Sequence, residues 1–384
     1  MIPRILQKRI KTLLSSSGAK KILLLFGPRQ VGKTTLLRSL AEERVQSAPA
    51  SPFLWLNADE PDIRSLLENA TSTALKKLCA SHQIVIIDEA QRVPGIGLTL
   101  KLMADTMQDV QIIATGSSAF DLAGQVQEPL TGRKREMYLF PLSFQEMVQY
   151  HGLMEEKRLL EYRLLYGYYP EAVQSRGEER EVVRSLAESY LFKDVLALGA
   201  IHKPDRLEKL VQALALQIGS EVSYNELGQI TGMNNETVER YITVLERAFV
   251  VFRLKSFSRN LRNELKKSRK IYFYDLGIRN AVINNFAALS ARTDTGAMWE
   301  NFLIAERMKA LSYQGLDKHR YFWRTSAQQE IDYLEERDGI LEGFEFKWNP
   351  NAKTRVPKPF LTAYPNTSVS VISRENAEDF LIFD

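Results

Sequence analysis

The sequence predicts an α/β protein in three parts: an N-terminal parallel sheet, a helical middle with a helix-turn-helix, and a C-terminal α+β domain. Three observations indicate this order. A glycine-rich segment near residue 30 lies between an apolar run and a helical pattern. Near residue 250, helical periodicity gives way to strand periodicity. Near the C-terminus, the stretch EIDYLEERDGILEGFEFKW alternates as strands do, with Glu345 and Lys347 on one face.

The length of 384 residues exceeds one ordinary domain, and we expect three domains, at 1–173, 174–285 and 286–384. Hydrophobic residues make up 45% and charged residues 26%, which is a globular composition. No apolar run approaches the roughly 18 residues of a membrane span, and the basic start lacks the pattern of a secretory signal. A single cysteine excludes an intrachain disulfide, and the histidines lack metal-ligand spacing. We therefore expect a cytoplasmic protein without a membrane partner.

The most specific motif lies in KILLLFGPRQVGKTTLLRSL, which contains Gly27-x-x-x-x-Gly32-Lys33-Thr34 between an apolar run and a helical pattern. Such a loop curls its backbone N–H groups around phosphates, and the following helix presents its N-terminus to the same charge. Lys33 would reach the β- and γ-phosphates, and the Thr34 hydroxyl would ligate Mg²⁺. The alternative is a glycine turn that binds nothing. The residues predicted to bind ATP here are Gly27, Pro28, Arg29, Gln30, Val31, Gly32, Lys33, Thr34 and Thr35.

A second element is needed to hold the metal and the attacking water. The stretch IVIIDEAQ brings Asp88 and Glu89 to the end of an apolar strand. Asp88 would hold the Mg²⁺ shell, and Glu89 would orient or deprotonate the water. Two acids at a strand end also occur without such a role. The next strand, VQIIATGSS, ends in hydroxyls where open α/β sheets contact ligands, so Thr115 or Ser117 could sense the γ-phosphate.

These stretches resemble the AAA-type ATPases, and they look closest to a large group of bacterial and archaeal ATP-binding proteins. The resemblance is carried by GPRQVGKTT, IVIIDEAQRVP, IIATGSSAFDL, LTGRKREMYLFPLSFQE and YGYYPEAV. It implies ATP hydrolysis and a homo-oligomer in which an arginine completes the neighbouring subunit's site. Arg133 is the candidate, with Arg135 in reserve, although either could form a structural ion pair. Tyr168 stands where the group has a glycine, so we expect a rearranged loop there.

In the middle, EVSYNELGQITGMNNETVERYITVLERAFVVFRL is similar to a helix-turn-helix in which Gly232 suits the turn. Its second helix mixes glutamates with arginines, which is a poor complement to a DNA groove. The basic excess follows it: residues 253–270 hold eight basic residues against the single acid Glu264, and would form the wing of a winged helix. We therefore predict DNA as a partner, held through this segment without base reading. A wing that packs against the ATPase domain is the alternative.

The resemblance continues through GAMWENFLIAERMKAL, YFWRTSAQQEIDYL and EGFEFKW, which look like a restriction-endonuclease-like, PD-(D/E)XK domain. The positions that match this type of domain are Glu300, Asp332, Glu345 and Lys347. The resemblance implies that Glu300, Asp332 and Glu345 hold Mg²⁺, and that Asp332, Glu345 and Lys347 are catalytic. Burial of these acids is unfavourable unless they are paired or coordinate a metal, and a paired, metal-free cluster satisfies the same constraint.

Together these observations predict a Mg²⁺-dependent AAA-type ATPase that acts on DNA. Two alternatives stay open: a metal-dependent DNA nuclease gated by ATP, and a nucleotide-gated protein-interaction module that cuts nothing. DNA affinity that is sensitive to salt, together with DNA-stimulated ATP turnover, would separate the first prediction from the interaction module. Loss of cleavage in Asp332→Ala, with ATP turnover intact, would favour the nuclease.

Overall fold

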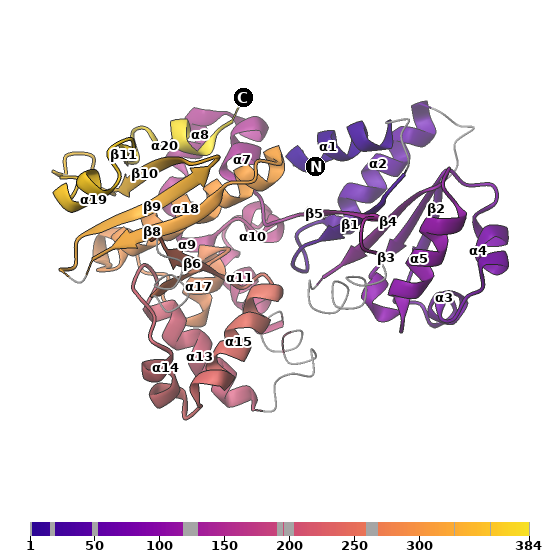
Figure 1. Ribbon diagram of the computed structural model, residues 1–384, viewed down its shortest axis with the longest axis horizontal. Coiled ribbons are helices and arrows are strands. Elements are labelled where there is room, and N and C mark those ends of the chain that lie inside the picture. Colours follow the sequence, from indigo (N-terminus) through magenta and orange to yellow (C-terminus); the bar gives the residue numbers. More distant parts are fainter. Residues whose placement is uncertain are drawn as a thin grey trace. The chain divides into compact units, whose positions relative to one another are not determined.

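The computed structural model describes residues 2–15, 20–47, 53–117, 130–189, 195, 203–258, 268–325, 327–353 and 355–383. The chain forms two compact units, shown as ribbons in Figure 1: residues 1–140 with 247–249, and residues 141–246 with 250–384. We expected boundaries at 173 and 285, whereas residues 141–173 pack with the C-terminal half. Along the described chain, no helix is both long and apolar enough to cross a membrane.

The first unit contains a five-stranded sheet in the order β2-β3-β4-β1-β5, with every neighbouring pair parallel. Its strands are β1 (Ile22–Phe26), β2 (Phe53–Asn57), β3 (Ile84–Asp88), β4 (Gln111–Gly116) and β5 (Lys134–Tyr138). Its helices are α1 (Ile5–Leu14), α2 (Lys33–Ser47), α3 (Pro61–Leu67), α4 (Ser72–Cys79), η1 (Ala90–Arg92) and α5 (Ile96–Thr106). β1, β3 and β4 are buried throughout, as strands inside a parallel sheet should be. The predicted parallel sheet is confirmed.

The strand order brings three predicted segments to one edge of this sheet. β3, β4 and β1 are parallel neighbours, so their carboxyl ends lie together. The glycine-rich loop follows β1, Asp88 ends β3, and Thr115 lies near the end of β4. Ligands of open α/β sheets bind at this edge.

The second unit is built on a six-stranded mixed sheet in the order β11-β10-β9-β8-β6-β7. Its strands are β6 (Val251–Ser256), β7 (Arg269–Phe273), β8 (His319–Arg324), β9 (Glu330–Arg337), β10 (Ile340–Phe346) and β11 (Ser368–Ile372). The pairs β6–β8 and β10–β11 are parallel, and the other neighbours are antiparallel. The mixed sheet agrees with the α+β class predicted for the C-terminal part.

The middle region of the second unit is mostly helical. The helices of this unit are α7 (Phe144–His151), α8 (Leu153–Arg158), α9 (Leu160–Tyr166), α10 (Pro170–Gln174), α11 (Glu179–Ala187), α13 (Pro204–Leu216), α14 (Tyr224–Thr231), α15 (Asn235–Arg247), α17 (Leu276–Val282), η3 (Leu289–Ala291), α18 (Thr295–Gln314), α19 (Lys358–Ala363) and α20 (Ala377–Leu381). The predicted helical pair is α14 and α15, joined by a turn in which Gly232 has a φ of 66°. Asn234 caps α15, because its Oδ1 accepts a hydrogen bond from the Thr237 N–H at 2.8 Å.

The hairpin that we expected as a wing, formed by β6 and β7, belongs to the six-stranded sheet. β6 pairs with β7 on one side and with β8 on the other, where Lys255 lies opposite Tyr321. Phe252 and Leu254 are buried, as residues of an inner strand should be. Strand periodicity located both strands but could not show that β6 also pairs with a strand more than sixty residues further on. Arg259, Arg262, Lys266 and Lys267, with Glu264, lie outside the described residues.

Tyr168, the departure from the expected glycine, is buried in the second unit. Its N–H donates to Asp275 Oδ2 at 2.7 Å, and Asp275 Oδ1 accepts from the Ile278 N–H at the start of α17. Gly167 has a φ of 74°, and a Cβ on it would lie 2.1 Å from Asp275 Oδ1. Only glycine fits that place without strain. The Tyr168 hydroxyl donates to the buried carboxylate of Glu156 at 2.6 Å. These contacts explain why residues 141–173 pack with the C-terminal half.

Asp294, the residue before α18, gives a pH-dependent prediction. It lies 2.6 Å from Arg279 Nη1 and 2.7 Å from Arg292 Nη2. Burial raises the carboxyl pKa, but hydrogen bonds from the two arginines outweigh burial and hold the pKa at about 2. The unfolded value is about 3.9. The ion pair therefore stabilises the fold fully above the unfolded pKa, and its contribution is lost as the pH falls through the folded pKa.

We expect Asp294→Asn to lower the free energy of unfolding at pH 7 by about 1–2 kcal/mol, measured by urea unfolding. The difference from wild type should shrink between about pH 4 and about pH 2, because wild type loses the same charge there. A difference that stays constant across this range would contradict the assignment.

Candidate functional site

The glycine-rich loop leaves β1 with two glycines that cannot be replaced easily. A Cβ on Gly27 would lie 2.0 Å from the Leu139 carbonyl oxygen, because the chain after β5 runs directly alongside. The Leu139 N–H donates to the Phe26 carbonyl at 2.7 Å, which fixes that approach. Gly32 has a φ of 92°, a conformation that favours glycine. The two glycines of the motif are therefore required by close packing and by backbone conformation.

Lys33 is the first residue of α2, and its side chain points back into the loop. Its ammonium donates to the carbonyl oxygens of Gly27 at 2.8 Å and Pro28 at 2.9 Å, and the residue is 5% exposed. The helix N-terminus faces the same loop and carries partial positive charge. An anion held in the loop would therefore meet an ammonium group and a helix N-terminus together.

Oxygen atoms from three elements meet beside the loop. The Thr34 hydroxyl donates to Asp88 Oδ2 at 2.9 Å, and the Thr115 hydroxyl donates to Asp88 Oδ1 at 2.6 Å. The Glu89 N–H donates in turn to the Thr115 hydroxyl at 2.9 Å. Hydroxyl and carboxylate oxygens are the ligands that Mg²⁺ takes in proteins. The structure thus brings the predicted Thr34, Asp88 and Thr115 into one hydrogen-bonded group.

Glu89 is held in an unusual backbone conformation by residues around it. Its φ of 53° is rare outside glycine, and such conformations cluster at functional sites. Gln91 Nε2 donates to Glu89 Oε2 at 2.5 Å and to the Ser117 hydroxyl at 3.0 Å. The sequence reasoning missed Gln91, although it stands in the same DEAQ stretch. Gln91 Oε1 is a buried acceptor that has no hydrogen-bond partner among the described residues.

Arg4, which precedes α1, was also missed. Its side chain is buried, and Nη1 donates to the Val31 carbonyl of the loop while Nη2 donates to the Phe140 carbonyl, both at 2.6 Å. Arg4 therefore ties the glycine-rich loop to the segment after β5. No local motif marks this role, because the partners lie 27 and 136 residues away.

The structure does not bring Arg133 to the glycine-rich loop of its own chain. Arg133 precedes β5, and its carbonyl accepts from the N–H of Ile22, the first residue of β1. The loop lies at the other end of β1. The Arg133 Nε lies 2.6 Å from Asp105 Oδ1, and both side chains are exposed. Arg135 lies exposed on β5 itself. A role for either arginine in a neighbouring subunit stays a prediction.

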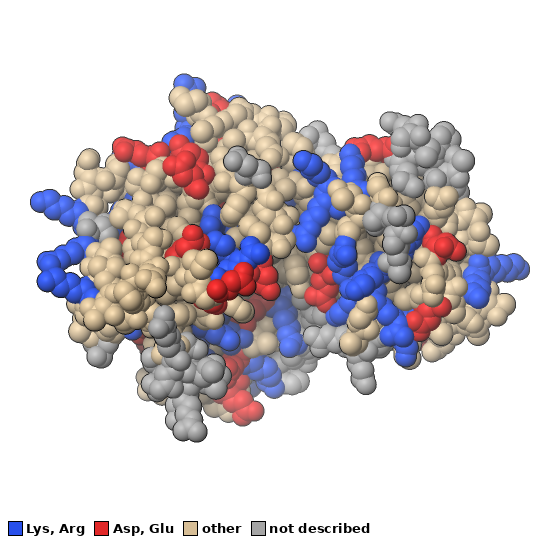
Figure 2. Space-filling view, turned by 45° about the horizontal axis from the view of Figure 1, so that its top comes forward, with Lys and Arg blue, Asp and Glu red and all other residues tan. Residues whose placement is uncertain are grey.

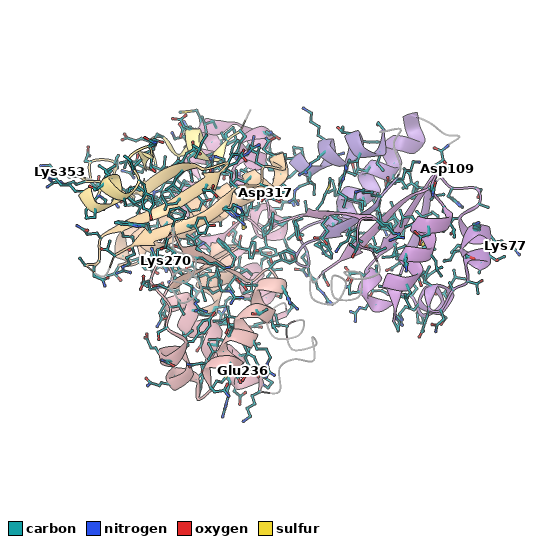
Figure 3. The ribbon with its side chains drawn as sticks, in the orientation of Figure 1. Lys77, Asp109, Glu236, Lys270, Asp317 and Lys353 are labelled. Atoms are coloured by element: carbon teal, nitrogen blue, oxygen red, sulfur yellow. The ribbon has the colours of Figure 1, made fainter. Side chains whose placement is uncertain are left out.

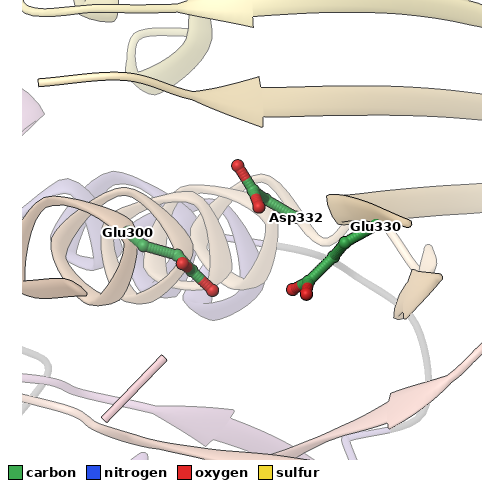
Figure 4. A group of neighbouring side chains, drawn as sticks. All are labelled: Glu300, Glu330 and Asp332. Atoms are coloured by element: carbon green, nitrogen blue, oxygen red, sulfur yellow. The ribbon is translucent and has the colours of Figure 1, made fainter. Parts of the chain in front are cut away.

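Three carboxylates meet in the second unit, as Figure 4 shows: Glu300 from α18, and Glu330 and Asp332 from β9. One oxygen from each lies within 4.8 Å of the others. Glu300 and Asp332 were predicted, and Glu330 was not. Strand alternation offered the signal, because residues two apart on a strand share a face.

The remaining predicted residues join the same group. Lys347 Nζ lies 3.0 Å from Glu345 Oε2 and 3.6 Å from Asp332 Oδ2. The Phe346 N–H donates to Asp332 Oδ2 at 2.8 Å. All four positions matched to the nuclease-like domain are therefore neighbours. The carboxylate cluster is defined here as Glu300, Glu330, Asp332 and Glu345.

Lys270 adds a buried cation that the sequence reasoning counted only as part of a basic segment. Its Nζ lies 2.9 Å from Glu300 Oε1 and also contacts Glu330 Oε1. Burial raises the pKa of the Glu300 carboxyl to about 7, although Lys270 lowers it, and Asp332 adds to the rise. Burial and Asp332 raise the pKa of Glu345 to about 7 against the effect of Lys347. The cluster therefore combines mutually repelling acids with ammonium groups.

A cavity of about 460 Å³ opens beside the carboxylate cluster. Its charged lining comprises Glu330, Glu345, Lys347, Lys353, Arg355 and Lys358. Figure 3 labels Lys353, which projects at the rim of the unit, and Lys270, which lies among the side chains of the sheet. On the face shown in Figure 2, basic and acidic side chains intermingle. The lining of the cavity therefore places basic side chains next to acidic ones.

The described part of the predicted DNA-binding segment is largely engaged with acids. Arg253 pairs with Glu246 and Glu239, and Arg269 pairs with Glu239. Lys270 is buried in the carboxylate cluster. Lys255 is exposed on β6. A phosphate-contacting role for residues 253–270 stays a prediction, and three of the four basic residues that the structure describes in it pair with acids.

Family models match this chain in three separate segments. Residues 19–148 match an AAA domain, residues 157–289 a domain of unknown function (DUF8612), and residues 295–382 another domain of unknown function (DUF4143). The parallel sheet and the glycine-rich loop of the N-terminal unit lie within the segment that matches the AAA domain. The other two descriptions assign no activity.

Relatives with similar sequences come from bacteria and archaea. An uncharacterized protein of Mycobacterium tuberculosis is 29% identical over 333 residues, which cover 85% of this chain and 70% of the relative. One from Haemophilus influenzae is 25% identical over 300 residues, 73% of either chain. One from Methanocaldococcus jannaschii is 24% identical over 340 residues, 77% of this chain and 71% of the relative.

Two solved structures align with part of this chain. The Orc1 protein of Aeropyrum pernix in complex with DNA has a TM-score of 0.33 at 15% identity, covering 73% of this chain and 91% of that chain. AMPPCP-bound DnaA from Aquifex aeolicus also has a TM-score of 0.33, at 17% identity over 62% of this chain and 86% of that chain. Scores at this level do not establish a shared overall fold.

Proposed function

We propose that the N-terminal unit binds ATP with Mg²⁺ and hydrolyses it. The observation that carries the proposal is the convergence of Lys33, Thr34, Asp88 and Thr115 at the carboxyl edge of the sheet, beside the loop. Among the described residues nothing donates to the buried Gln91 Oε1, which fits a site that holds a further hydrogen-bond donor, such as a water molecule. An AAA domain match over residues 19–148 adds to this.

Each residue has a separate part in the proposed reaction. The loop N–H groups and Lys33 would bind the phosphates, and Thr34 with Asp88 would hold Mg²⁺, which neutralises phosphate charge when it is bound. Glu89 would orient the attacking water and accept its proton. Gln91 is a positioning residue, because it holds the Glu89 carboxylate at 2.5 Å.

The proposal is tested first by the binding of a fluorescent ATP analogue. Lys33→Ala should weaken its affinity by about 10- to 100-fold, because a charge-assisted contact to phosphate is lost. Lys21→Ala is the matched control, since Lys21 lies just before β1 and is exposed. Equal affinity of the two variants would count against the proposed site.

Arg4→Ala should weaken ATP binding by about tenfold, because it leaves the buried carbonyls of Val31 and Phe140 without their donors. The same titration measures it, with the exposed Lys8→Ala on α1 as the control. If Arg4 only stabilises the fold, the thermal midpoint would fall while the affinity of the remaining folded protein stayed unchanged.

DNA binding by the second unit is a second proposed function. It is supported by the four basic side chains around the cavity beside the carboxylate cluster: Lys347, Lys353, Arg355 and Lys358. DNA affinity should then fall steeply with salt, and the triple variant Lys353→Ala, Arg355→Ala and Lys358→Ala should flatten the log–log slope by up to about three. DNA-stimulated ATP turnover would link the two units.

The same DNA samples test the alternatives. Strand cleavage that disappears in Asp332→Ala would make the protein a nuclease, and an absence of both DNA binding and cleavage would favour a protein-interaction module. Action of Arg133 in a homo-oligomer stays a prediction. Mixing Lys33→Ala with Arg133→Ala protein should restore turnover if Arg133 completes a neighbour's site.

A further inference from the structure

The ammonium group of Lys270 contacts Glu300 and Glu330, two of the three carboxylates that Figure 4 draws. It is 2.9 Å from Glu300 Oε1 and contacts Glu330 Oε1, and the side chain is 1% exposed. Nζ also lies 5.4 Å from the centre of the Phe322 ring. Lys270 is thus enclosed by two acids and an aromatic ring, and its charge cannot reach water without a rearrangement of the sheet.

The resemblance to restriction-endonuclease-like domains implies Mg²⁺ at Glu300, Asp332 and Glu345, and the donor set can be tested for it. Mg²⁺ binds carboxylate lone pairs. Glu300 Oε1, however, already accepts hydrogen bonds from Lys270 and from the Tyr272 hydroxyl, the latter at 2.6 Å. A metal ion at this oxygen would have to displace one of these buried donors.

The other implied ligands are engaged in the same way. Asp332 Oδ2 accepts from the Phe346 N–H at 2.8 Å and lies 3.6 Å from Lys347 Nζ. Glu345 Oε2 lies 3.0 Å from the same ammonium. Hydrogen-bond donors thus already contact an oxygen of each of these two carboxylates. Each of the three implied ligands thus has one oxygen that a hydrogen-bond donor already engages, and two of these donors are the cations Lys270 and Lys347. This donor set fits a metal ion poorly while both ammonium groups remain in place.

We infer that Lys270 is the resident cation of the carboxylate cluster, and that the native cluster takes no divalent metal ion. A divalent ion beside Glu300 and Glu330 would lie within a few ångströms of the Lys270 ammonium, where like charges repel strongly in a medium of low dielectric constant. Moving Lys270 away would leave its charge buried and unpaired. Lys270 lies on β7 and instead links this strand to α18 and β9 through its ion pairs with Glu300 and Glu330. This inference goes beyond the proposed ATP hydrolysis and does not rest on it.

The test is a titration with Mn²⁺ at pH 8 without nucleotide. Electron paramagnetic resonance measures the concentration of free Mn²⁺ at each step. Native protein should show no Mn²⁺ site that Asp332→Asn removes. Lys270→Met keeps much of the side-chain volume and removes the charge, so it should create a site that binds Mn²⁺ at least about tenfold more tightly than native protein does. Adding Asp332→Asn to that variant should abolish the new site.

Two controls keep the outcomes distinct. Lys318→Met is the matched variant, because Lys318 also bridges two glutamates, Glu335 and Glu342, but outside the cluster; it should gain no Mn²⁺ site. If Lys270→Met does not fold, the comparison of native protein with Asp332→Asn still decides. Mn²⁺ binding by native protein that depends on Asp332 would overturn the inference, as would a folded Lys270→Met without a gain. Neither result bears on ATP binding.

Discussion

Replacing Glu89 by glutamine is expected to lower ATP turnover by about 100- to 10,000-fold, because the carboxylate that positions and deprotonates the water is lost. ATP affinity should stay within about twofold of native protein, since Glu89 makes no predicted contact to phosphate. The left-handed backbone of Glu89 and the hydrogen bond from Gln91 hold the carboxylate in one orientation. Phosphate release, measured beside fluorescent ATP binding, separates the two effects.

The matched control for this prediction is Glu42→Gln, an exposed glutamate on α2, which should leave turnover unchanged. Gln91→Leu should give an intermediate loss, about tenfold, because it removes only the positioning hydrogen bond. Full turnover in Glu89→Gln with native ATP affinity would mean that another group prepares the water. A parallel loss of affinity would instead indicate damage to the loop.

Replacing Arg307 by leucine is expected to lower the free energy of unfolding of the second unit by about 3–5 kcal/mol. Arg307 meets Glu335 with two hydrogen bonds, at 2.7 and 3.0 Å, and donates a third to the Phe380 carbonyl at 2.6 Å. The Glu335 side chain is fully buried, so removing its partner leaves a buried charge that Lys318 balances only in part. Denaturant unfolding followed by tryptophan fluorescence measures the loss, because Trp299, Trp323 and Trp348 lie in this unit.

The double variant Arg307→Leu with Glu335→Gln should recover part of that stability, because the uncompensated charge is removed with its partner. A double variant that is less stable by the sum of both single changes would show that the two residues do not interact. A single Arg307→Leu change with less than about 1 kcal/mol of effect would show that water solvates Glu335 when Arg307 is absent.

The residues of the proposed nucleotide site were predictable because their signals are local in sequence. Gly27 to Thr34 follow one strand and Asp88 ends another, and parallel strands bring such ends to one edge. Arg4 was not predictable, because its partners are set by tertiary packing after β5. Gln91 lies close to Glu89 in sequence, but its orientation depends on the turn that begins at Glu89.

The carboxylate cluster was predictable only in part, for a different reason. The resemblance to restriction-endonuclease-like domains identified four residues of the site. The alternation of side chains along β9 could have identified Glu330 as well. Lys270 stands in a basic run whose charge suggested exposure to phosphate. The pairing of β6 with β8 places β7 at the border of a six-stranded sheet, where Lys270 faces inward. Net charge along a segment therefore could not distinguish a buried cation from a surface one.

The pairing of β6 with β8 has a consequence for dividing the chain. The family matches end at residue 289 and resume at residue 295, yet one sheet draws β6 and β7 from the first match and β8 to β11 from the second. A fragment that begins at residue 286 would uncover the backbone N–H and C=O groups of β8, and bare strand edges pair with other molecules. It would also lack Lys270. A fragment that begins at residue 141 keeps the whole sheet. We therefore expect limited proteolysis to leave this longer fragment intact, and recombinant expression to yield the fragment from residue 286 only as aggregate.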